Sequence, residues 1–327
     1  MRYTKSAYDA AEQIMQDRLR KAEEERAERI EEIRQKLPEV YSLFMSMRSV
    51  GYGMLSVIGS GVGREDARAK MKALREQNES TRETVRGMLR SFGYPEDYLE
   101  YHYFCSTCSD RGYKEGKRCG CMEKLLKEQS IRELNKNCSI KLHDFSEFDL
   151  NFYRGIKQEG YDVMSKMEMI YRYCVDYSMD FREDSPSMLF YGKTGLGKTF
   201  LSSCIAKYLI EQGYTVFFGS IIKFFRQLED EQFGRKEGNS FEIISDADLV
   251  ILDDLGSEFK TSFTESKLYE ILNERMNSGK PVIVSTNIDV TELDKKYNER
   301  IVSRLVSFTT VEFMGNDIRQ EIRRLGR

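Results

Sequence analysis

One short segment, GKTGLGKT at positions 192–199, constrains the fold of this chain more than any other feature. It matches the pattern G-x-x-x-x-G-K-[ST], a P-loop, in which backbone N–H groups of a glycine-rich turn surround phosphate oxygens. The apolar run SMLFY precedes it and the run FLSSCIAKYLIEQ follows it, as a strand and a helix should. A glycine-rich turn without a ligand is the alternative, and this context weighs against it. The predicted loop comprises Gly192, Lys193, Thr194, Gly195, Leu196, Gly197, Lys198 and Thr199.

Two side chains at the end of this loop predict the nucleotide chemistry. Lys198, on an exposed loop, should reach the β- and γ-phosphates of ATP, and the Thr199 hydroxyl should bind Mg²⁺. The N-terminus of the following helix adds the positive end of its dipole. The sequence therefore predicts a site for ATP and Mg²⁺.

A second acidic element follows another apolar run, in ADLVILDDLG. Asp253 is placed to hold the magnesium through water, and Asp254 to orient the attacking water. The alternative is a pair of carboxylates at an exposed strand end. Together with the P-loop, the pair predicts an ATPase.

Polar residues beyond the acidic pair are candidates for contacts with the γ-phosphate. Asn287 closes the apolar run PVIVSTN, where it could position the same water, although asparagine also forms turns. Arg300 and Arg304 lie four residues apart on one helix face and could reach the nucleotide of a neighbouring copy; solvated surface arginines are the alternative. Arg319, in FMGNDIRQ, is a further candidate.

From about Tyr161 onward, apolar strands alternate with amphipathic helices, which predicts a mostly parallel sheet covered by helices. Helices should be capped by Thr264 and Thr291 and should end before Gly213 and Gly279. The expected strands are Met188–Tyr191, Tyr214–Phe218, Leu249–Leu252, Val282–Thr286 and Phe308–Phe313.

The N-terminal part has a different composition. Glutamate alternates with lysine or arginine, and pairs such as Glu25 with Arg29 have helical spacing. The glycine-rich stretch from Gly51 to Gly63 should separate two helical pieces. The expected organisation is a helical partner-binding domain over 1–100, a zinc module over 101–125, a linker over 126–160 and the ATPase domain over 161–327.

Four of the seven cysteines crowd into a short segment. Cys105 and Cys108 form C-x₂-C, and Cys119 and Cys121 form C-x-C, so four thiolates could surround one structural Zn²⁺. Because C-x-C is a tight chelate, His102 could replace one cysteine. Redox chemistry is less favoured because no thioredoxin-like strand and helix frame the pair. The remaining Cys138, Cys174 and Cys204 are expected to be ordinary thiols.

The order GKTGLGKT, VILDDLGSE, VIVSTN, ERIVSRL and FMGNDIR resembles the AAA+ ATPases of the DnaC/DnaI type, which are helicase loaders, with the transposition helper IstB as a close relative. The resemblance covers Phe145–Arg327. It implies an α/β AAA+ P-loop core with a five-stranded parallel sheet in the order 5-1-4-3-2. It also implies that Asn287 is sensor 1, that Arg304 or Arg300 is an arginine finger acting in trans, and that Arg319 is sensor 2.

Two departures from the wider superfamily narrow the resemblance. The acidic pair is Asp-Asp, whereas most AAA+ proteins have Asp-Glu, and few residues follow Arg319, so the helical lid should be reduced or absent. Both fit the loader branch. Loaders of the DnaI type carry a zinc-containing module that contacts the helicase, and IstB proteins usually lack one.

The leading functional hypothesis is an ATP-switched, self-associating loader of a hexameric DnaB-type replicative helicase onto single-stranded DNA. An IstB-like transposition helper that recruits a transposase is one alternative, and a nucleotide-gated DNA- or protein-binding module with little hydrolysis is another. No apolar run approaches the ~20 residues that span a bilayer, so a cytoplasmic protein with no membrane partner is expected. The net charge of −3 leaves nucleic-acid contacts to local patches.

One such patch is expected on the helix that begins after Ser220. Lys223 and Arg226 share a face and could follow a DNA backbone. Of Phe224 and Phe225, one should pack inward and the other could stack on a base. An amphipathic helix with an ordinary basic edge is the alternative. For adenine, the linker aromatics Phe145, Phe148 and Tyr153 are weak candidates.

Overall fold

The protein is described from a computed structural model that places residues 3–47, 64–138 and 141–324. The predicted helix separator at Gly51–Gly63 lies outside these residues. The chain divides into two compact units, one formed by Met1–Ala11 with Glu123–Arg327 and the other by Glu12–Met122. Each unit is described by itself.

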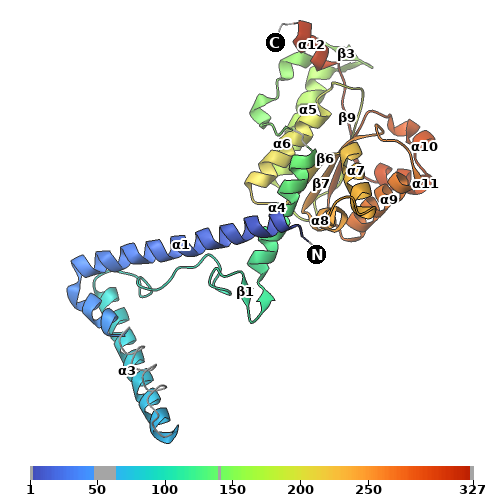
Figure 1. Cartoon of the computed structure of the whole chain (residues 1–327). Coiled ribbons are helices and arrows are strands. Elements are labelled where there is room, and N and C mark those ends of the chain that lie inside the picture. The colour runs from blue at the N-terminus through green and yellow to red at the C-terminus, as the bar shows by residue number, and fades with distance from the viewer. Residues whose placement is uncertain (1–2, 48–63, 139–140, 325–327) are drawn as a thin grey trace. The chain divides into compact units, whose positions relative to one another are not determined.

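The larger unit contains a five-stranded sheet in the order β6-β7-β8-β5-β9, and every neighbouring pair is parallel (Figure 1). Numbered one to five along the chain and read from the β9 edge, the strands run 5-1-4-3-2, so the predicted α/β fold and strand order are confirmed. The strands are β5 (Met188–Tyr191), β6 (Val216–Ser220), β7 (Leu249–Leu255), β8 (Val282–Thr286) and β9 (Thr309–Glu312).

Three of these strands differ in extent from the prediction. Strand β6 begins later than expected because Tyr214 and Thr215 have other partners: the Tyr214 N–H donates to Leu209 O at 3.0 Å, and the Thr215 N–H donates to the Asp248 carboxylate at 2.7 Å. Strand β7 extends past its apolar residues through the acidic pair, and β9 is shorter at both ends.

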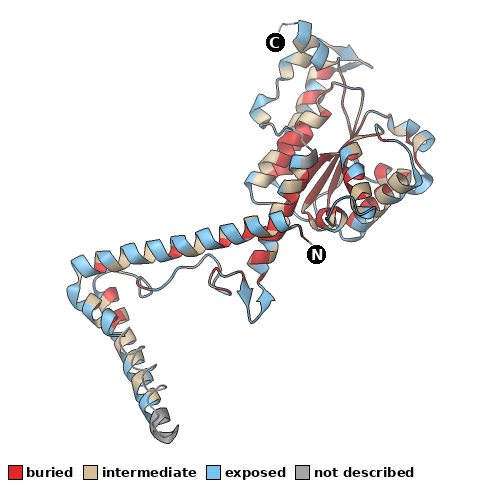
Figure 2. Cartoon of the chain, in the orientation of Figure 1, coloured by how far each residue is buried: buried red, intermediate tan, exposed pale blue. Residues whose placement is uncertain are grey.

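Alternation along the strands places apolar residues on both faces of the sheet, as parallel strands require. Met188 and Phe190 pack with α5 and α6, whereas Leu189 faces the side covered by α7, α8, α9 and α11. Figure 2 shows these strands as buried between their helices. The helices are α5 (Val163–Met179), α6 (Lys198–Glu211), α7 (Ile221–Gln232), α8 (Ser240–Asp246), α9 (Ser262–Asn277) and α11 (Glu299–Val306).

Short elements connect this layered core. They are the 3-10 helices η1 (Phe145–Glu147), η2 (Leu150–Tyr153) and η3 (Val290–Glu292), the strands β3 (Lys157–Gln158) and β4 (Tyr161–Asp162), and the helices α10 (Leu293–Lys296) and α12 (Ile318–Arg324). Helix α12 is the last element among the described residues.

Two predicted helix caps are wrong, and two predicted helix ends are confirmed. Helix α9 begins three residues earlier than expected because Thr261 caps it, its hydroxyl accepting from the Thr264 N–H. Thr291 lies inside η3, which Asp289 caps. Gly213 and Gly279 follow the ends of α6 and α9 with left-handed φ of 87° and 68°.

Helix α4 (Gly120–Cys138) covers the open edge of the sheet. An edge strand exposes unpaired backbone groups, and here the Asn135 side chain bonds both Val216 O at 2.8 Å and the Phe218 N–H at 2.9 Å. Ile131 and Leu134 add apolar contacts to the core. Part of the region expected to be linker, residues 126–138, is therefore helix packed on the ATPase core.

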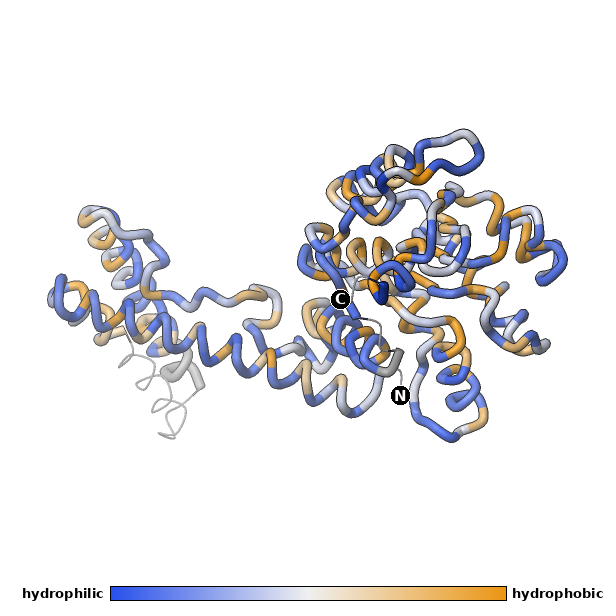
Figure 3. The backbone as a smooth tube through the Cα atoms, turned by 90° about the horizontal axis from the view of Figure 1, so that it is seen from above, coloured by the Kyte–Doolittle hydropathy of each residue, from blue (hydrophilic) through white to orange (hydrophobic). Residues whose placement is uncertain are grey.

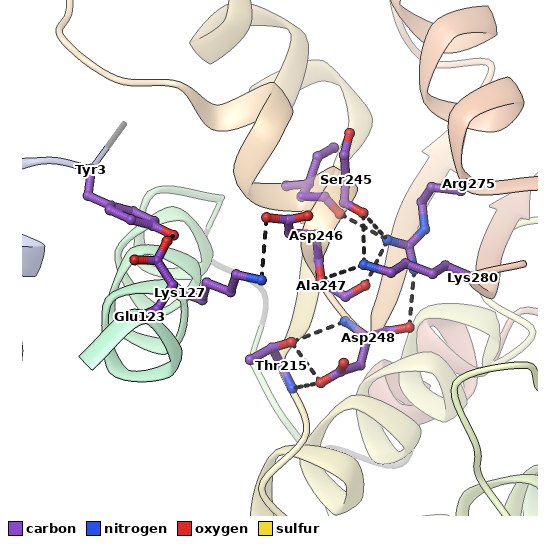
Figure 4. Close-up of polar contacts among 11 residues, drawn as sticks. Tyr3, Glu123, Lys127, Thr215, Ser245, Asp246, Ala247, Asp248, Arg275 and Lys280 are labelled. Carbon is purple, nitrogen blue, oxygen red and sulfur yellow. Dashed lines mark hydrogen bonds and ion pairs between the residues drawn. The ribbon is translucent and has the colours of Figure 1, made fainter. Parts of the chain in front are cut away.

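A buried guanidinium joins the segments that precede strands β7 and β8. Arg275 is fully buried, and it donates to the carbonyls of Ile244, Ala247, Asp248 and Pro281 at 2.8–3.1 Å. Figure 4 shows Arg275 with Ala247 and Asp248. Figure 4 also shows Asp246 paired with Lys127 of α4 at 3.4 Å. No motif indicated this role, since an arginine in a helical run is normally solvated.

The smaller unit is mainly helical. It contains most of α1 (Lys5–Lys36), a helical stretch over 38–47, α3 (Arg64–Ser91) and a hairpin of β1 (Tyr113–Lys114) with β2 (Lys117–Arg118). Its small core includes Ile33, Val40, Val85 and Leu89. Figure 3 shows that α1 is mostly hydrophilic, as the Glu and Arg alternation predicts. Among the described helices, none is long and apolar enough to cross a membrane.

Candidate nucleotide site and cysteine cluster

A cavity of about 550 Å³ lies where strands β5, β7 and β8 end. Parallel α/β sheets bind ligands at this edge, because the loops and helix N-termini that hold phosphates gather there. The residues that line it include Lys141, His143, Phe148, Phe152, Thr194, Gly195, Leu196, Gly197, Lys198, Thr199, Phe200, Asp253, Asp254, Ser285, Asn287, Ile318 and Arg319.

The P-loop needs glycine at two close approaches. At Gly192 φ is 133°, and a Cβ there would lie 2.4 Å from Phe313 O. At Gly195 φ is 76°, and a Cβ would lie 2.0 Å from the Asp317 carboxylate. The Ile318 N–H donates to Gly195 O at 3.0 Å, so the start of α12 is held against the loop.

Lys198 is the first residue of α6, and only 6% of its surface is exposed. The expectation of an exposed loop lysine is therefore wrong, because the loop folds over the base of the helix. Its ammonium donates to Gly192 O at 2.6 Å, Lys193 O at 2.7 Å and Asn287 Oδ1 at 2.8 Å. Burial lowers its pKa to about 8, although both acidic residues nearby oppose the shift.

Thr199 and Asp253 meet across the cavity. The Thr199 hydroxyl lies 3.0 Å from both carboxylate oxygens of Asp253. Ser285 on β8 donates to Asp253 Oδ1 at 2.5 Å. Burial raises the pKa of Asp253, and these two hydroxyls oppose the shift. Adjacent hydroxyl and carboxylate oxygens are the hard ligands that Mg²⁺ prefers, so this pair fits the ion.

Asn287 connects the lysine with the second acid. Its Oδ1 accepts from Lys198, and its Nδ2 donates to Asp254 Oδ1 at 2.7 Å. Asp254 has a φ of 64°, which is rare for a residue with a side chain, and its N–H donates to Ser285 Oγ at 3.0 Å. The structure thus brings together the residues predicted from three separate motifs.

The sequence reasoning largely missed the aromatic end of the cavity. His143 stacks on Phe200, with ring centroids 4.3 Å apart, and Phe148 lies 5.7 Å from Phe200. Of the three aromatics considered for adenine, only Phe148 is among the lining residues described. Tyr153 is buried and donates to Leu196 O at 2.9 Å, and Phe145 packs on Tyr171. Phe200 directly follows the P-loop, which is the signal that could have found it.

The candidate arginines occupy different surroundings. Arg319 lines the cavity, whereas Arg300 and Arg304 of α11 are not among the described lining residues. Arg300 is exposed. The Arg304 guanidinium lies 4.3 Å from the centroid of the Tyr269 ring on α9, and it also donates to Asn273.

The four clustered cysteines converge in the smaller unit. The sulfurs of Cys105, Cys108, Cys119 and Cys121 all lie within 4.8 Å of one another, with Cys105–Cys119 at 3.8 Å and Cys108–Cys121 at 3.4 Å. A tetrahedral zinc with Zn–S of about 2.3 Å would separate its sulfurs by about 3.8 Å. The cluster therefore fits one zinc ion.

Local hydrogen bonds support this arrangement of thiols. The Gly112 N–H donates to Cys108 Sγ at 3.3 Å, and the Asp110 carboxylate accepts from the Cys105 N–H at 2.8 Å. The Cys108 N–H is the main cause that lowers the pKa of Cys105 to about 6. His102 instead contacts Asp97, at 3.1 Å from its carbonyl. Cys174 and Cys204 are free and buried in the other unit, and the side chain of Cys138 lies outside the described residues.

The proposed base-stacking role on α7 is wrong. Both Phe224 and Phe225 are buried, because the apolar stripe of a surface helix is wide enough to include adjacent positions. Lys223 and Arg226 are exposed, as predicted. Ser220 precedes α7 as expected, although its side chain makes no capping bond.

Several known proteins are similar to this chain. The replicative helicase loader DnaC of Buchnera aphidicola subsp. Baizongia pistaciae is 25% identical over 220 residues, 65% of this chain and 81% of the relative. The loader DnaI of Bacillus subtilis (strain 168) is 26% identical over 221 residues, 60% of this chain and 68% of the relative. A crystal structure of DnaI, at 22% identity, has a TM-score of 0.43 over 57% of this chain and 92% of that chain.

The family comparison covers the whole nucleotide site. The sequence profile of the IstB-like ATP binding proteins matches residues 130–324. This segment is more than half of the chain, and it contains the P-loop, the acidic pair and Asn287. The chain therefore belongs to the family of IstB-like ATP binding proteins.

Proposed function

We propose that this protein is an ATP-dependent loader that places a replicative helicase on single-stranded DNA. The observation that carries this proposal is the similarity to loaders named DnaC and DnaI, which extends over 81% and 68% of those relatives. The connected phosphate-binding groups support the ATP-dependent part. A helicase loader uses ATP as a switch, so modest turnover is expected.

The nucleotide is ATP, hydrolysed to ADP and phosphate. Lys198 turns its ammonium from the loop carbonyls to the β- and γ-phosphates, and the P-loop N–H groups bind the remaining phosphate oxygens. Asp254 orients the attacking water, and Asn287, bonded to both Lys198 and Asp254, relates that water to the γ-phosphate. The aromatic end, with His143 and Phe200, suits a flat base.

Magnesium would be held by Thr199 directly and by Asp253 through water. The ion supplies positive charge to the β- and γ-phosphate oxygens when it is bound. Ser285 orients the Asp253 carboxylate toward Thr199 through its hydrogen bond. Without that bond, the carboxylate could rotate away from the hydroxyl.

The protein self-associates through its AAA+ domain. The described residues that line the cavity do not include Arg300 or Arg304. Their position suits a contribution to the nucleotide site of a neighbouring copy. An arginine supplied in trans stabilises the charge on the transferring phosphate. Arg319 lines its own cavity and suits a cis contact with the γ-phosphate.

The smaller unit is the partner-binding part. Its four converging thiolates hold one structural zinc, and its helices within residues 12–100 contact the hexameric DnaB-type helicase. Exposed Lys223 and Arg226 on α7 contribute charge toward single-stranded DNA. Because both phenylalanines of this helix are buried, the contact there is with phosphates rather than with bases.

A second candidate function is favoured by the family itself, whose profile is named after IstB. A transposition helper would recruit a transposase with the same nucleotide site. A nucleotide-gated module with little hydrolysis is a third possibility. The cysteine cluster favours the loader, since loaders of the DnaI type carry a zinc-containing module.

Native mass spectrometry of this chain with a hexameric replicative helicase, with and without ATP, tests the proposal. We expect a stable complex whose composition changes with the nucleotide. The matched control is Lys198→Ala, which should remove the nucleotide effect. No complex with the helicase, combined with capture of a transposase, would assign the protein to the second candidate. A turnover assay with ATP separates both from a non-hydrolysing module.

A further inference from the structure

Glu258 is a buried acid that closes the motif VILDDLGSE, and the nucleotide chemistry described above gives it no role. It follows Asp254 by four residues, and only 8% of its surface is exposed. Its Oε2 accepts from the Gly256 N–H at 2.7 Å, and its Oε1 accepts from the Tyr297 hydroxyl. Burying a carboxylate costs free energy unless it is hydrogen-bonded, so these two bonds stabilise Glu258 in its buried position.

The loop that Glu258 holds is the direct continuation of the acidic strand. Gly256 donates its N–H to Glu258, and its carbonyl accepts from Lys296. Its φ is 103°, and a Cβ there would lie 2.6 Å from Ile288 Cδ1. Thr286 donates to the Leu255 carbonyl at 2.7 Å. The backbone after Asp254 is therefore held by residues 286–297.

The other end of this contact is the start of α11. Tyr297 is 5% exposed and directly precedes Asn298, whose side chain caps α11 by accepting from the Ile301 N–H at 3.1 Å. Burial and the neighbouring Glu258 raise the pKa of Tyr297, so its phenol stays protonated and donates. Helix α11 carries Arg300 and Arg304.

We propose that Glu258 and Tyr297 are positioning residues that join the acid Asp254 of one nucleotide site to the arginine helix serving the next site. The proposal rests on the proposed function, in which the α11 arginines act on a neighbouring copy. A displacement of the loop after Asp254 would move the cap of α11 through Gly256, Glu258 and Tyr297. Two adjacent sites would then respond together through one buried contact.

Substitutions at positions 258 and 297 differ in how many of these hydrogen bonds they keep. A glutamine at position 258 can accept from the Gly256 N–H through its oxygen and donate to the Tyr297 oxygen through its nitrogen, so both bonds survive. An alanine loses both. A phenylalanine at 297 loses one bond and leaves Glu258 with fewer partners. The loss of function should follow the lost bonds and not the lost charge.

The first experiment compares steady-state ATP hydrolysis and nucleotide affinity in full-length variants. Glu258→Ala should lower kcat roughly tenfold, because a misplaced catalytic group reacts slowly, while the Kd for an ATP analogue changes less than about twofold. Glu258→Gln should stay near wild type, and Tyr297→Phe should fall between. The matched control is Glu292→Ala, an exposed acid on η3 in the same connection. Equal kcat in Glu258→Ala, Tyr297→Phe and the control would overturn the proposal.

Tyr297→Phe keeps the test open if Glu258→Ala does not fold, since it removes only a hydroxyl. A lowered kcat for Glu258→Gln equal to that of alanine would mean that charge, and not the connection, matters. That result would also overturn the proposal.

Mixed oligomers then show on which side of the contact Glu258 acts. Lys198→Ala subunits keep their arginines, and Arg300→Ala/Arg304→Ala subunits keep their own nucleotide site, so mixing them should restore activity that neither shows alone. Adding Glu258→Ala to either subunit should lower the restored activity several-fold. If Glu258→Ala lowers the restored activity only when it is placed in the Arg300→Ala/Arg304→Ala subunit, Glu258 acts only on Asp254 of its own site. That result would overturn the joint role. Absence of restoration between the parent variants would instead reject the trans arginines of the proposed function.

Discussion

The nucleotide site and the cysteine cluster are assembled over very different lengths of chain. The cavity collects residues from Lys141 to Ile322, and its key bonds join positions far apart, such as Lys198 with Asn287. The cysteine cluster collects four side chains between Cys105 and Cys121. One site depends on the order of strands in a sheet, and the other on a few turns and a hairpin.

This difference teaches that the two sites should fail in different ways. A metal cluster in a short segment draws most of its stability from the metal itself, because the local chain has little apolar surface to bury. The nucleotide site is held by the sheet, so a single substitution should remove its chemistry and leave the fold. The following experiments test this contrast, beginning with the largest expected effect.

Zinc removal should have the largest effect. We expect about one zinc per chain in protein purified under reducing conditions, and its removal should destabilise residues 105–121 by about 10 kcal/mol, the scale of structural zinc in small modules. Metal analysis and hydrogen exchange over this segment measure both effects. Cys108→Ser should lose the zinc, whereas Cys174→Ala, a buried thiol of the other unit, should keep it. Freshly purified protein without zinc would reject the site.

Lys198→Ala should lower ATP hydrolysis about 100-fold or more, because a preorganised charge on the transferring phosphate is lost. Circular dichroism should show an intact fold, since the sheet does not depend on this side chain. Lys260→Ala, on an exposed lysine paired with Glu265, is the charge-matched control. ATPase activity equal to wild type in Lys198→Ala would contradict the P-loop assignment.

The pH dependence of nucleotide affinity gives a smaller effect. Because the pKa of Lys198 is lowered to about 8 without nucleotide, part of the population is neutral above that pH. Bound phosphate favours the charged form, so the complex holds more protons and affinity should fall as the pH rises above about 8, by at most about tenfold per pH unit. Below about pH 8 the affinity should be nearly constant.

Titrations with an ATP analogue from about pH 6.5 to about 9.5 measure this profile. Lys198→Arg is the matched control, since arginine stays charged over the whole range and should remove the decline. A flat profile in the wild-type protein would show that Lys198 is fully protonated before nucleotide binds.

The smallest effect is expected for DNA. Lys223→Ala with Arg226→Ala should weaken single-strand binding a few-fold and reduce the slope of log affinity against log salt by about 1.4, the value for two phosphate contacts. Arg172→Ala with Arg182→Ala removes the same charge from other exposed positions. If the Lys223→Ala/Arg226→Ala variant has the same DNA affinity and the same salt slope as the control double variant, α7 serves packing alone.

The motifs predicted most of the phosphate end of the site. P-loop spacing has a fixed structural meaning, and the acidic pair and Asn287 each follow a run of apolar strand residues, so their gathering at one sheet edge follows from parallel topology. The aromatic end was harder to predict. His143 and Phe200 meet only because the segment before η1 folds back onto the start of α6. No local pattern encodes that return.

Errors in the prediction have similar causes. The P-loop pattern does not indicate the burial of Lys198, because that burial depends on the loop folding over α6. The expectation that one of Phe224 and Phe225 stacks on a base rests on adjacent helix positions pointing in different directions, yet α7 packs deeply enough to bury both rings.

The sequence by itself determined the elements with local meaning: the P-loop, the spacing of four cysteines, the strand and helix alternation, and through them the family. Their physical basis is short-range, in glycine conformations, chelate spacing and periodic apolar residues. Only the tertiary structure decided that Asn135 completes the edge strand, that Arg275 binds buried carbonyls and that Glu258 meets Tyr297. Such polar contacts leave no periodic trace, because each depends on two distant segments that are brought together by apolar burial.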